Sequence, residues 1–371
     1  MKVKEINNFQ DLSSEWNKTL QSNLFGNNVF LTWEWLSTWW KHFGDGRKPL
    51  ILIVEDQNKI LAIAPLMLSS YKLPLFGNVK KIEFIGVKHS DYSNFIIIDN
   101  EKECLKLIIN YLKDTILNWN WIELKQIPEP TENSNFLPIL FSDISSLTLK
   151  TRVCTKCPYI PLPNSFNLLM TGLNKKLRKT LKYNNRNIKE KYSVELKRYD
   201  EAGYSVKEAM KVFLNLHEAR WAQEGQPGLF KDTSFLNFHM ETANIFAEKN
   251  WLGLYFLTAN DEPVAVQYSF EYFKKMYSYL SGFNPKYAGF SVGNLLNIYL
   301  LERCIKNGFV EFDWLRGEEP YKLKWTNISR RNFEIRLIKN GLLNSYYNWI
   351  TWNKNINNIA IKLKLSVKRT S

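Results

Sequence analysis

The sequence predicts an α/β fold made of two domains. The chain has 371 residues, more than one ordinary domain core accommodates. Hydrophobic residues make up 45% of it and aromatic residues 15%, proportions that exclude a disordered chain. In both halves, short apolar runs typical of strands alternate with longer segments of helical periodicity. We therefore expect mixed sheets flanked by helices.

The first half of the chain has the pattern of a complete α/β unit. A strand near Val3 precedes a helix after Asp11, whose carboxylate can cap the first helical turn. Segment 32–43 has Leu and Trp side chains at helical spacing, which predicts a helix with a buried aromatic face. The remaining predicted elements are strands at 50–55, 60–68, 81–85, 95–98 and 121–125 and a helix at 102–117.

The second half begins with a strongly basic helix, predicted over 173–191. Leu173, Leu177 and Leu181 mark its apolar side. Its other side carries Lys175, Lys176, Arg178, Lys179, Lys182, Arg186, Lys189 and Lys191. Helices are expected at 205–221 and 233–249, followed by a meander of strands at 252–258, 264–272 and 275–282.

We divide the chain into an N-terminal domain at 1–150, a C-terminal domain at 151–345 and a basic tail at 346–371. The tail mixes isoleucines with Lys and Arg. We interpret it as a last helix packed on the domain, although a helix lying on a membrane surface has the same pattern.

The charge and the apolar runs limit the partners and the location. The formal net charge is +14, from 50 basic and 36 acidic residues, which attracts nucleic acid, anionic lipid or a polyphosphate cofactor without choosing among them. Compositional bias toward Lys alone gives the same surplus. The basic helix at 175–191 is the expected contact for an anionic surface or tRNA.

No apolar run reaches the roughly 18 to 20 residues of a membrane span, and the N-terminus lacks the apolar core of a signal peptide. We expect a cytoplasmic protein without a transmembrane segment, with a membrane-peripheral location as the alternative.

The four cysteines give no metal or redox site. Cys104 and Cys304 fall in helical patterns typical of small buried side chains. Cys154 and Cys157 form a lone CxxC without a second pair or nearby histidines, so we assign no metal site.

The most informative segment is Gly308 to Trp325, where an apolar strand runs into the loop Asp-Trp-Leu-Arg-Gly-Glu-Glu-Pro-Tyr-Lys at 313–322. Upstream, the run from Gly282 to Gly293 leads into a helix. Together these motifs resemble the acetyltransferase family associated with cellulose biosynthesis in the GNAT superfamily, which is related to the FemABX-like aminoacyl transferases. The resemblance extends from about residue 30 to 341. It implies tandem GNAT-like domains, with acetyl-CoA or another acyl-CoA as co-substrate bound by the second domain.

The helix that opens at Gly289–Gly293 is the expected donor site. Free amides and the positive dipole end of a helix bind pyrophosphate, and Ser291 is a suitable N-cap. The donor-binding residues are expected to be Phe290, Ser291, Val292, Gly293 and Asn294. Val292 stands where the family has Pro, which should loosen the first turn slightly. Asn284 stands where the family has an acid, so no charge role is assigned there.

The loop after the last core strand holds the expected catalytic groups. Asp313 can accept a proton from the incoming amine, and Tyr321 can protonate the departing thiolate. An ion-paired strand end, with Asp313 bridging to Arg316, is the structural alternative. The expected substrate-binding residues are Asp91, Tyr92, His217, Arg220, Arg316, Glu319 and Lys322. For the pairs Asp91–Tyr92 and His217–Arg220, a capped turn or a buried hydrogen-bond anchor is the alternative.

The expected reaction is direct transfer of an acyl group, normally acetyl, from acyl-CoA to an amine on a sugar or cell-envelope (polysaccharide) precursor. No covalent enzyme intermediate is required. One alternative keeps the fold but uses aminoacyl-tRNA as the donor. A second is a non-catalytic protein that binds an anionic polymer or a membrane.

Overall fold

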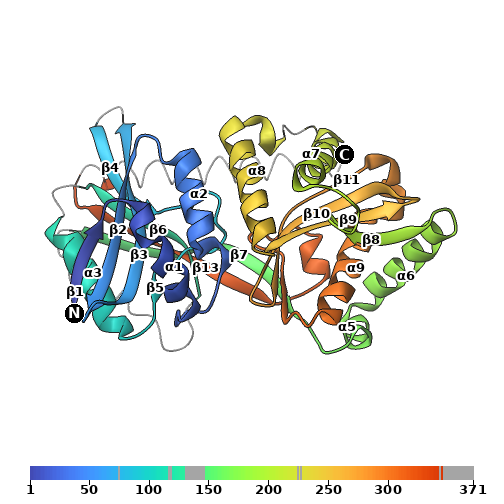
Figure 1. Cartoon of the computed structure of the whole chain (residues 1–371), viewed down its shortest axis with the longest axis horizontal. Coiled ribbons are helices and arrows are strands. Elements are labelled where there is room, and N and C mark those ends of the chain that lie inside the picture. Colours follow the sequence, from blue (N-terminus) through green and yellow to red (C-terminus); the bar gives the residue numbers. More distant parts are fainter. Residues whose placement is uncertain are drawn as a thin grey trace.

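The two halves of the protein share one continuous sheet with helices on both sides (Figure 1). The computed structural model describes residues 1–73, 76–115, 119–129, 147–223, 225, 228–341 and 344–345. The strand order is β1-β2-β3-β4-β6-β13-β7-β12-β11-β10-β9-β8, with β5 paired to β3. The predicted α/β class with mixed sheets flanked by helices is confirmed.

The elements of the first half are β1 (Lys2–Ile6), α1 (Ser13–Gln21), α2 (Trp33–Phe43), β2 (Arg47–Asp56), β3 (Lys59–Leu73), β4 (Gly77–Phe84), β5 (Ile96–Ile97), α3 (Glu101–Asp114) and β6 (Trp121–Pro128). The second half contains β7 (Leu147–Pro161), α5 (Phe166–Gly172), α6 (Lys175–Lys189), β8 (Val194–Arg198), α7 (Val206–Gln223), α8 (Thr233–Glu248), β9 (Leu252–Ala259), β10 (Glu262–Tyr272), β11 (Lys275–Phe283), α9 (Val292–Lys306), β12 (Glu311–Asp313) and β13 (Ser329–Lys339). Short 3₁₀ turns include η4 (Leu229–Lys231) and η5 (Pro285–Phe290).

The two halves repeat one arrangement. From each outer edge of the sheet inward, the strands run β1-β2-β3-β4-β6 and β8-β9-β10-β11-β12. Within each set the neighbouring pairs are antiparallel except the last, since β4 pairs parallel with β6 and β11 pairs parallel with β12. Each set has two helices after its first strand and one long helix before its last. A tandem arrangement, expected from the resemblance, is therefore visible in the topology itself.

Two long strands join the halves. β7 pairs with β13 from Leu147 to Pro158 and then with β12 from Tyr159 to Pro161. β13 comes from the end of the chain yet lies between β6 and β7, in the sheet of the first half. The domain boundary near residue 150 stays a prediction, and the basic tail at 346–371 lies outside the described residues.

Aromatic side chains pack the halves together. The Trp35 ring of α2 lies 4.9 Å from the Phe238 ring of α8, and both side chains are fully buried. The indoles of Trp35 and Trp39 also donate to Ser90 Oγ and His89 Nδ1 of the loop after β4. The prediction that the tryptophan-rich helix has a buried face is confirmed, because buried indole N–H groups need partners and here find them.

Some local predictions differ from the structure. The helix expected at 173–191 is present as α6, which begins two residues later, at Lys175, and a short helix, α5, that was not anticipated precedes it. Ser291 was expected to cap α9, but within the described chain its side chain makes no capping bond, and its φ of 53° is left-handed. Strands β8 and β13 were not anticipated. None of the described helices has the length and apolar character needed to cross a membrane.

Candidate active site

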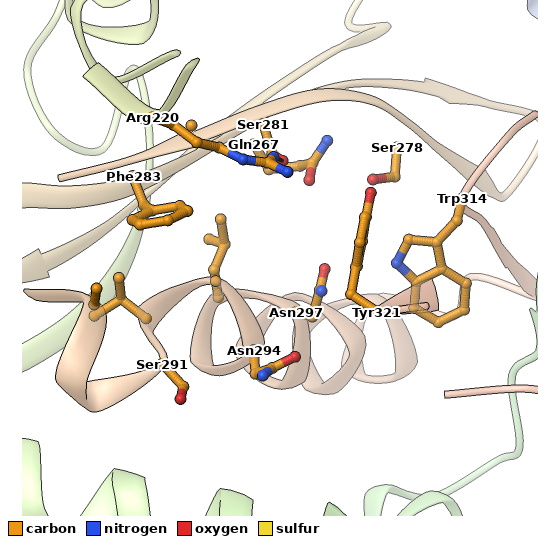
Figure 2. A pocket seen from close by; sticks show the side chains of 15 residues that line it. Arg220, Gln267, Ser278, Ser281, Phe283, Ser291, Asn294, Asn297, Trp314 and Tyr321 are labelled. Carbon is orange, nitrogen blue, oxygen red and sulfur yellow. Dashed lines mark hydrogen bonds between the residues drawn. The ribbon is translucent and has the colours of Figure 1, made fainter. Parts of the chain in front are cut away.

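A gap between two parallel strands creates the first cavity. β11 and β12 pair over three residues only, from Lys275 opposite Glu311 to Tyr277 opposite Asp313. Beyond that point β11 continues to Phe283, whereas the chain after β12 turns away at Trp314. The opening is a cavity of about 260 Å³, with β11 along one side and α9 along another (Figure 2). In the first half, the buried rings of Phe84 and Phe95 pack 5.2 Å apart beside the equivalent strand end.

The backbone of β11 faces this gap. Asn284 N donates to Val264 O. Asn284 and Val264 are therefore a hydrogen-bonded pair in the antiparallel ladder between β10 and β11. Since such pairs alternate along an antiparallel ladder, the backbone groups of Ser281 and Phe283 point away from β10 and toward the gap. The register shifts between Tyr268 and Ser269, which leaves Tyr279 of β11 as a bulge residue. The Ser281 carbonyl of this edge accepts from His217 Nδ1, and an extended ligand can pair with the remaining backbone groups of the edge.

The N-terminus of α9 closes one end of the same cavity. Ser291, Val292, Gly293 and Asn294 all line it. Asn294 N and Leu295 N bond back to Ser291 O, so the amides of Val292 and Gly293 are the two first-turn groups left for a ligand. A Cβ at Gly293 would meet nothing within 4 Å, which shows open space beside that backbone. These features suit a phosphate group.

A larger cavity of about 670 Å³ adjoins the first. Its walls come from both halves: Lys88, His89 and Asp91 from the loop after β4, and residues of α7, α8, β11 and the 314–322 loop from the second half. The two cavities share six lining residues, namely Arg220, Gln267, Ser278, Ser281, Trp314 and Tyr321. A donor in the smaller cavity and an acceptor in the larger one would meet there.

Tyr321 lies at this junction. Figure 2 shows its hydroxyl directed across the cavity toward Ser278. Burial raises the pKa of Tyr321 to about 12, with Glu319 adding to the effect. The phenol therefore keeps its proton at neutral pH and can donate it.

Asp313 is placed differently. It is fully buried and is not one of the described residues that line either cavity. Tyr92 Oη donates to its carboxylate over 2.6 Å, Leu315 N over 2.7 Å and Arg330 Nη1 over 3.1 Å. Burial raises the pKa of Asp313 to about 6, although Arg330 opposes this. Its partner is therefore Arg330 and not Arg316. The role of Asp313 as proton acceptor stays a prediction, and the geometry favours a positioning role.

Four charged side chains expected to bind substrate line the larger cavity. Arg316 Nε lies 2.5 Å from Asp91 Oδ1, and Lys322 Nζ lies 2.9 Å from Glu319 Oε2. Arg316 also donates to Lys88 O, and Lys322 donates to Arg316 O. Burial raises the pKa of Asp91 despite the guanidinium beside it. The Arg316–Asp91 pair connects the 314–322 loop to the loop after β4, and the Lys322–Glu319 pair lies within the 314–322 loop.

His217 and Arg220 line the larger cavity as expected, and Arg220 lines both. The Nδ1 of His217 lies 2.9 Å from Ser281 O, so this nitrogen must carry the proton and donate it. Among the described residues, Nε2 of the same ring has no hydrogen-bond partner. Burial lowers the pKa of His217, which keeps the imidazole neutral. A Cβ at Gly282 would lie 2.4 Å from His217 N, so the glycine permits this close contact of α7 with β11.

Two expected site residues lie elsewhere. Phe290 packs near Tyr192, with ring centroids 6.0 Å apart, and is not part of the described lining of the smaller cavity. Tyr92 is buried and bonded to Asp313. Conversely, sequence reasoning missed the roles of Gln267, Ser278 and Ser281, which lie within the meander strands. Small polar residues in an otherwise apolar strand are the signal that could have indicated them.

Three comparisons with known proteins bear on this site. Residues 175–323 match the family described as "Acetyltransferase (GNAT) domain". This segment is similar to GNAT acetyltransferase domains, which supports the prediction of an N-acyltransferase. The match covers less than half of the chain. The comparison with curated proteins found no match.

Among solved structures, FemX is similar with a TM-score of 0.63 at 11% identity, covering 90% of this chain and 97% of that one. A conserved protein of unknown function from Bacteroides thetaiotaomicron VPI-5482 has a TM-score of 0.55 at 11% identity and covers 91% and 100%. The C-terminal domain of a putative lysylphosphatidylglycerol synthetase from Agrobacterium fabrum has a TM-score of 0.50 at 12% identity and covers 89% and 93%. At such identities the likeness shows the fold alone, which is similar to that of FemX over nearly the whole chain.

Proposed function

We propose that the protein transfers an acyl group from acyl-CoA to an amine. The observation that carries this proposal is the pair of adjoining cavities that share six lining residues at the opening between β11 and β12. A two-substrate transfer requires such a junction, because the amine and the thioester must meet in the correct orientation.

The smaller cavity has the features that acyl-CoA needs. Its pyrophosphate fits the amides of Val292 and Gly293 at the positive end of α9. Its extended arm fits the backbone edge of β11 at Ser281 and Phe283, where amide groups can pair as an added strand. The thioester then reaches Tyr321, whose retained proton can pass to the departing sulfur.

The acceptor is proposed to be an amine on a sugar or cell-envelope precursor, and the acyl group to be acetyl, as in the acetyltransferases associated with cellulose biosynthesis. Support for a polar acceptor comes from the larger cavity, where Asp91, Arg316, Glu319 and Lys322 present charges of both signs. Its volume of about 670 Å³ falls within the range of small-molecule sites.

Aminoacyl-tRNA as the donor is the second candidate. The observation in its favour is the exposed basic face of α6, which contacts both α9 and η5. A third candidate, binding of an anionic polymer without catalysis, predicts salt-sensitive binding and no thiol release.

The first test is calorimetric titration of the full chain with acetyl-CoA. The Gly293→Val side chain would occupy the open space at the α9 N-terminus, so we expect CoA affinity to fall on the order of tenfold or more, which is ~1.4 kcal/mol. Gly172→Val is a matched control, because Gly172 also has open space around it but lies at the end of α5. Equal CoA affinity in the two variants would contradict the donor assignment.

A further inference from the structure

The amide of Gln267 is held in one orientation where the two cavities meet. Gln267 lies on β10 and is only 3% exposed. Its Nε2 donates to Tyr268 O and to Leu280 O, each over 3.0 Å. Because a backbone carbonyl can only accept, the nitrogen must occupy this end of the amide, and Oε1 must occupy the other.

The oxygen faces the reaction space. Gln267 lines both cavities, and Figure 2 shows its amide oxygen directed toward the space above Asn297 and Tyr321 and its nitrogen directed back toward the sheet. The two carbonyls that fix the amide belong to the Tyr268–Leu280 pair, which lies next to the bulge at Tyr279. The fold therefore fixes one hydrogen-bond acceptor, Gln267 Oε1, at the junction of the two cavities, where a nucleophile in the larger cavity would approach a donor in the smaller one.

We propose that Gln267 Oε1 accepts a hydrogen bond from the attacking nucleophile and makes the site selective for amines over hydroxyl groups. This inference rests on the proposed acyl transfer and names the residue that selects the amine acceptor.

The selectivity follows from the chemistry of an amide oxygen, which accepts hydrogen bonds but is not basic enough to take a proton at neutral pH. A neutral primary amine has two N–H groups and a lone pair. When one N–H is bonded to Gln267, the lone pair remains free to attack the acyl carbon. The oxygen of a hydroxyl group or of water is a weak nucleophile, and one of its protons must pass to a base as it attacks. The amide oxygen of Gln267 cannot take that proton.

The transfer balances without another reactant. The amine nitrogen forms a bond to the acyl carbon, the C–S bond breaks, and its electron pair goes to sulfur. The Tyr321 hydroxyl gives its proton to the sulfur, and the surplus proton of the new amide nitrogen restores the phenol. The products are an amide and a free thiol. Gln267 orients the nucleophile and takes no proton.

The test follows two products of the full-length protein with acetyl-CoA. Glucosamine is the amine probe and water is the hydroxyl probe, so N-acetylglucosamine and acetate are quantified together by NMR. Gln267→Leu should lower amide formation on the order of 10²-fold, as expected for lost orientation, and leave hydrolysis nearly unchanged. Gln267→Glu places a group that can become a base there, so the acetate share should rise, and rise further with pH.

Asn184→Leu is the matched control, because Asn184 of α6 is a buried amide that lines neither of these two cavities. It should leave the ratio of amide to acetate at the parental value. Thermal unfolding identifies any variant that does not fold. A purely structural role for Gln267 would lower both products together.

The possible results distinguish failure of the Gln267 inference from failure of the proposed acyl transfer. An unchanged amide-to-acetate ratio in both folded Gln267 variants overturns the role of Gln267. Acetyl-CoA binding without amide formation by the parental protein overturns the amine specificity and leaves the donor site standing. Absence of acetyl-CoA binding overturns the proposed function, and the inference with it.

Discussion

Tyr321 and Asp313 belong to one segment of the chain but have different surroundings. Tyr321 faces both cavities, whereas Asp313 is enclosed by Tyr92, Leu315 and Arg330. A group that moves a proton during turnover must reach the reacting atoms. Tyr321 meets this condition, and Asp313 meets it only if the loop changes its conformation.

Tyr321→Phe should slow acyl transfer without weakening donor binding. Loss of a positioned acid costs on the order of 10² to 10⁴ in rate. Because burial raises the pKa of Tyr321 to about 12, ionisation of this phenol should not limit the rate between pH 6 and 9. Single-turnover thiol release measures the effect. A Tyr321→Phe variant that binds CoA and transfers at the parental rate would show that the proton comes from elsewhere.

Asp313→Asn tests a positioning role against a catalytic one. Disruption of a buried ion pair typically costs about 3 to 5 kcal/mol, so the free energy of unfolding should fall if Asp313 chiefly holds Arg330. Tyr92→Phe removes a second member of the network, and its effect should be smaller in the Asp313→Asn background than in the parental protein. Denaturant unfolding of the four proteins measures this coupling. Parental stability combined with a lost rate of thiol release would instead support Asp313 as the base.

At the scale of elements, helix α6 has a positively charged face and lies next to the proposed donor site at the N-terminus of α9. Lys175, Lys179, Lys182, Arg186 and Lys189 recur at intervals of four and three residues, which places them along one stripe of the helix. Within the described chain, Glu190 is the acid that pairs with this stripe, at Arg186. The buried Leu177, Leu181 and Ile188 fix which side of the helix faces solvent. The Lys191 ammonium lies 5.6 Å from the Phe290 ring, just before α9.

Reversal of Lys175, Lys176 and Lys179 to Glu should slow association of the polyanionic donor, and the loss should be greatest at low salt. Exposed charges act over about 10 Å at 0.1 M ionic strength, so salt screens them. Stopped-flow association at several salt concentrations gives the dependence. Loss of the same size at every ionic strength would exclude long-range attraction as the cause.

At the scale of the whole molecule, three buried histidines lie where the halves meet. Burial lowers the pKa of His89 to about 3, and Lys88 and Arg316 lower it further, whereas Asp232 opposes the shift. Burial also lowers the pKa of His217 and of His239. Between pH 6.5 and about 3, the unfolded chain binds a proton at His89 that the folded protein does not. His89 therefore contributes to the free energy of unfolding at neutral pH, and this contribution is lost as the pH falls from 6.5 toward about 3.

His89→Gln should reduce this dependence on pH. A Gln carbonyl can still accept from Trp39 Nε1, as His89 Nδ1 does, but it does not titrate. From pH 6 to pH 5 the parental protein should lose up to about 1.4 kcal/mol more than the variant. Asp313, with its pKa raised to about 6, contributes in the opposite direction in both proteins, so the comparison cancels it. If the free energy of unfolding changed equally with pH in the two proteins, the pKa of His89 would be the same in the folded and unfolded states.

The sequence by itself determined the α/β class and the order of most elements, and most of the site residues that it predicted line one of the two cavities. Periodicity predicted α2 and α7 to α9, because a helix or strand buries one face in any fold. The motif at 313–322 indicated Arg316, Glu319, Tyr321 and Lys322, since chemically active side chains crowd into one short segment there.

Only the tertiary structure decided which of these groups meet. β13 returns to the first half, and Asp313 is covered by Tyr92 and Arg330, which lie 221 and 17 residues away along the chain. The orientation of Gln267 depends on carbonyls at a β-bulge, which local pattern does not predict. The physical reason is that strand pairing, burial and hydrogen-bond partners depend on contacts between distant segments. Periodicity reports only the face that each segment buries.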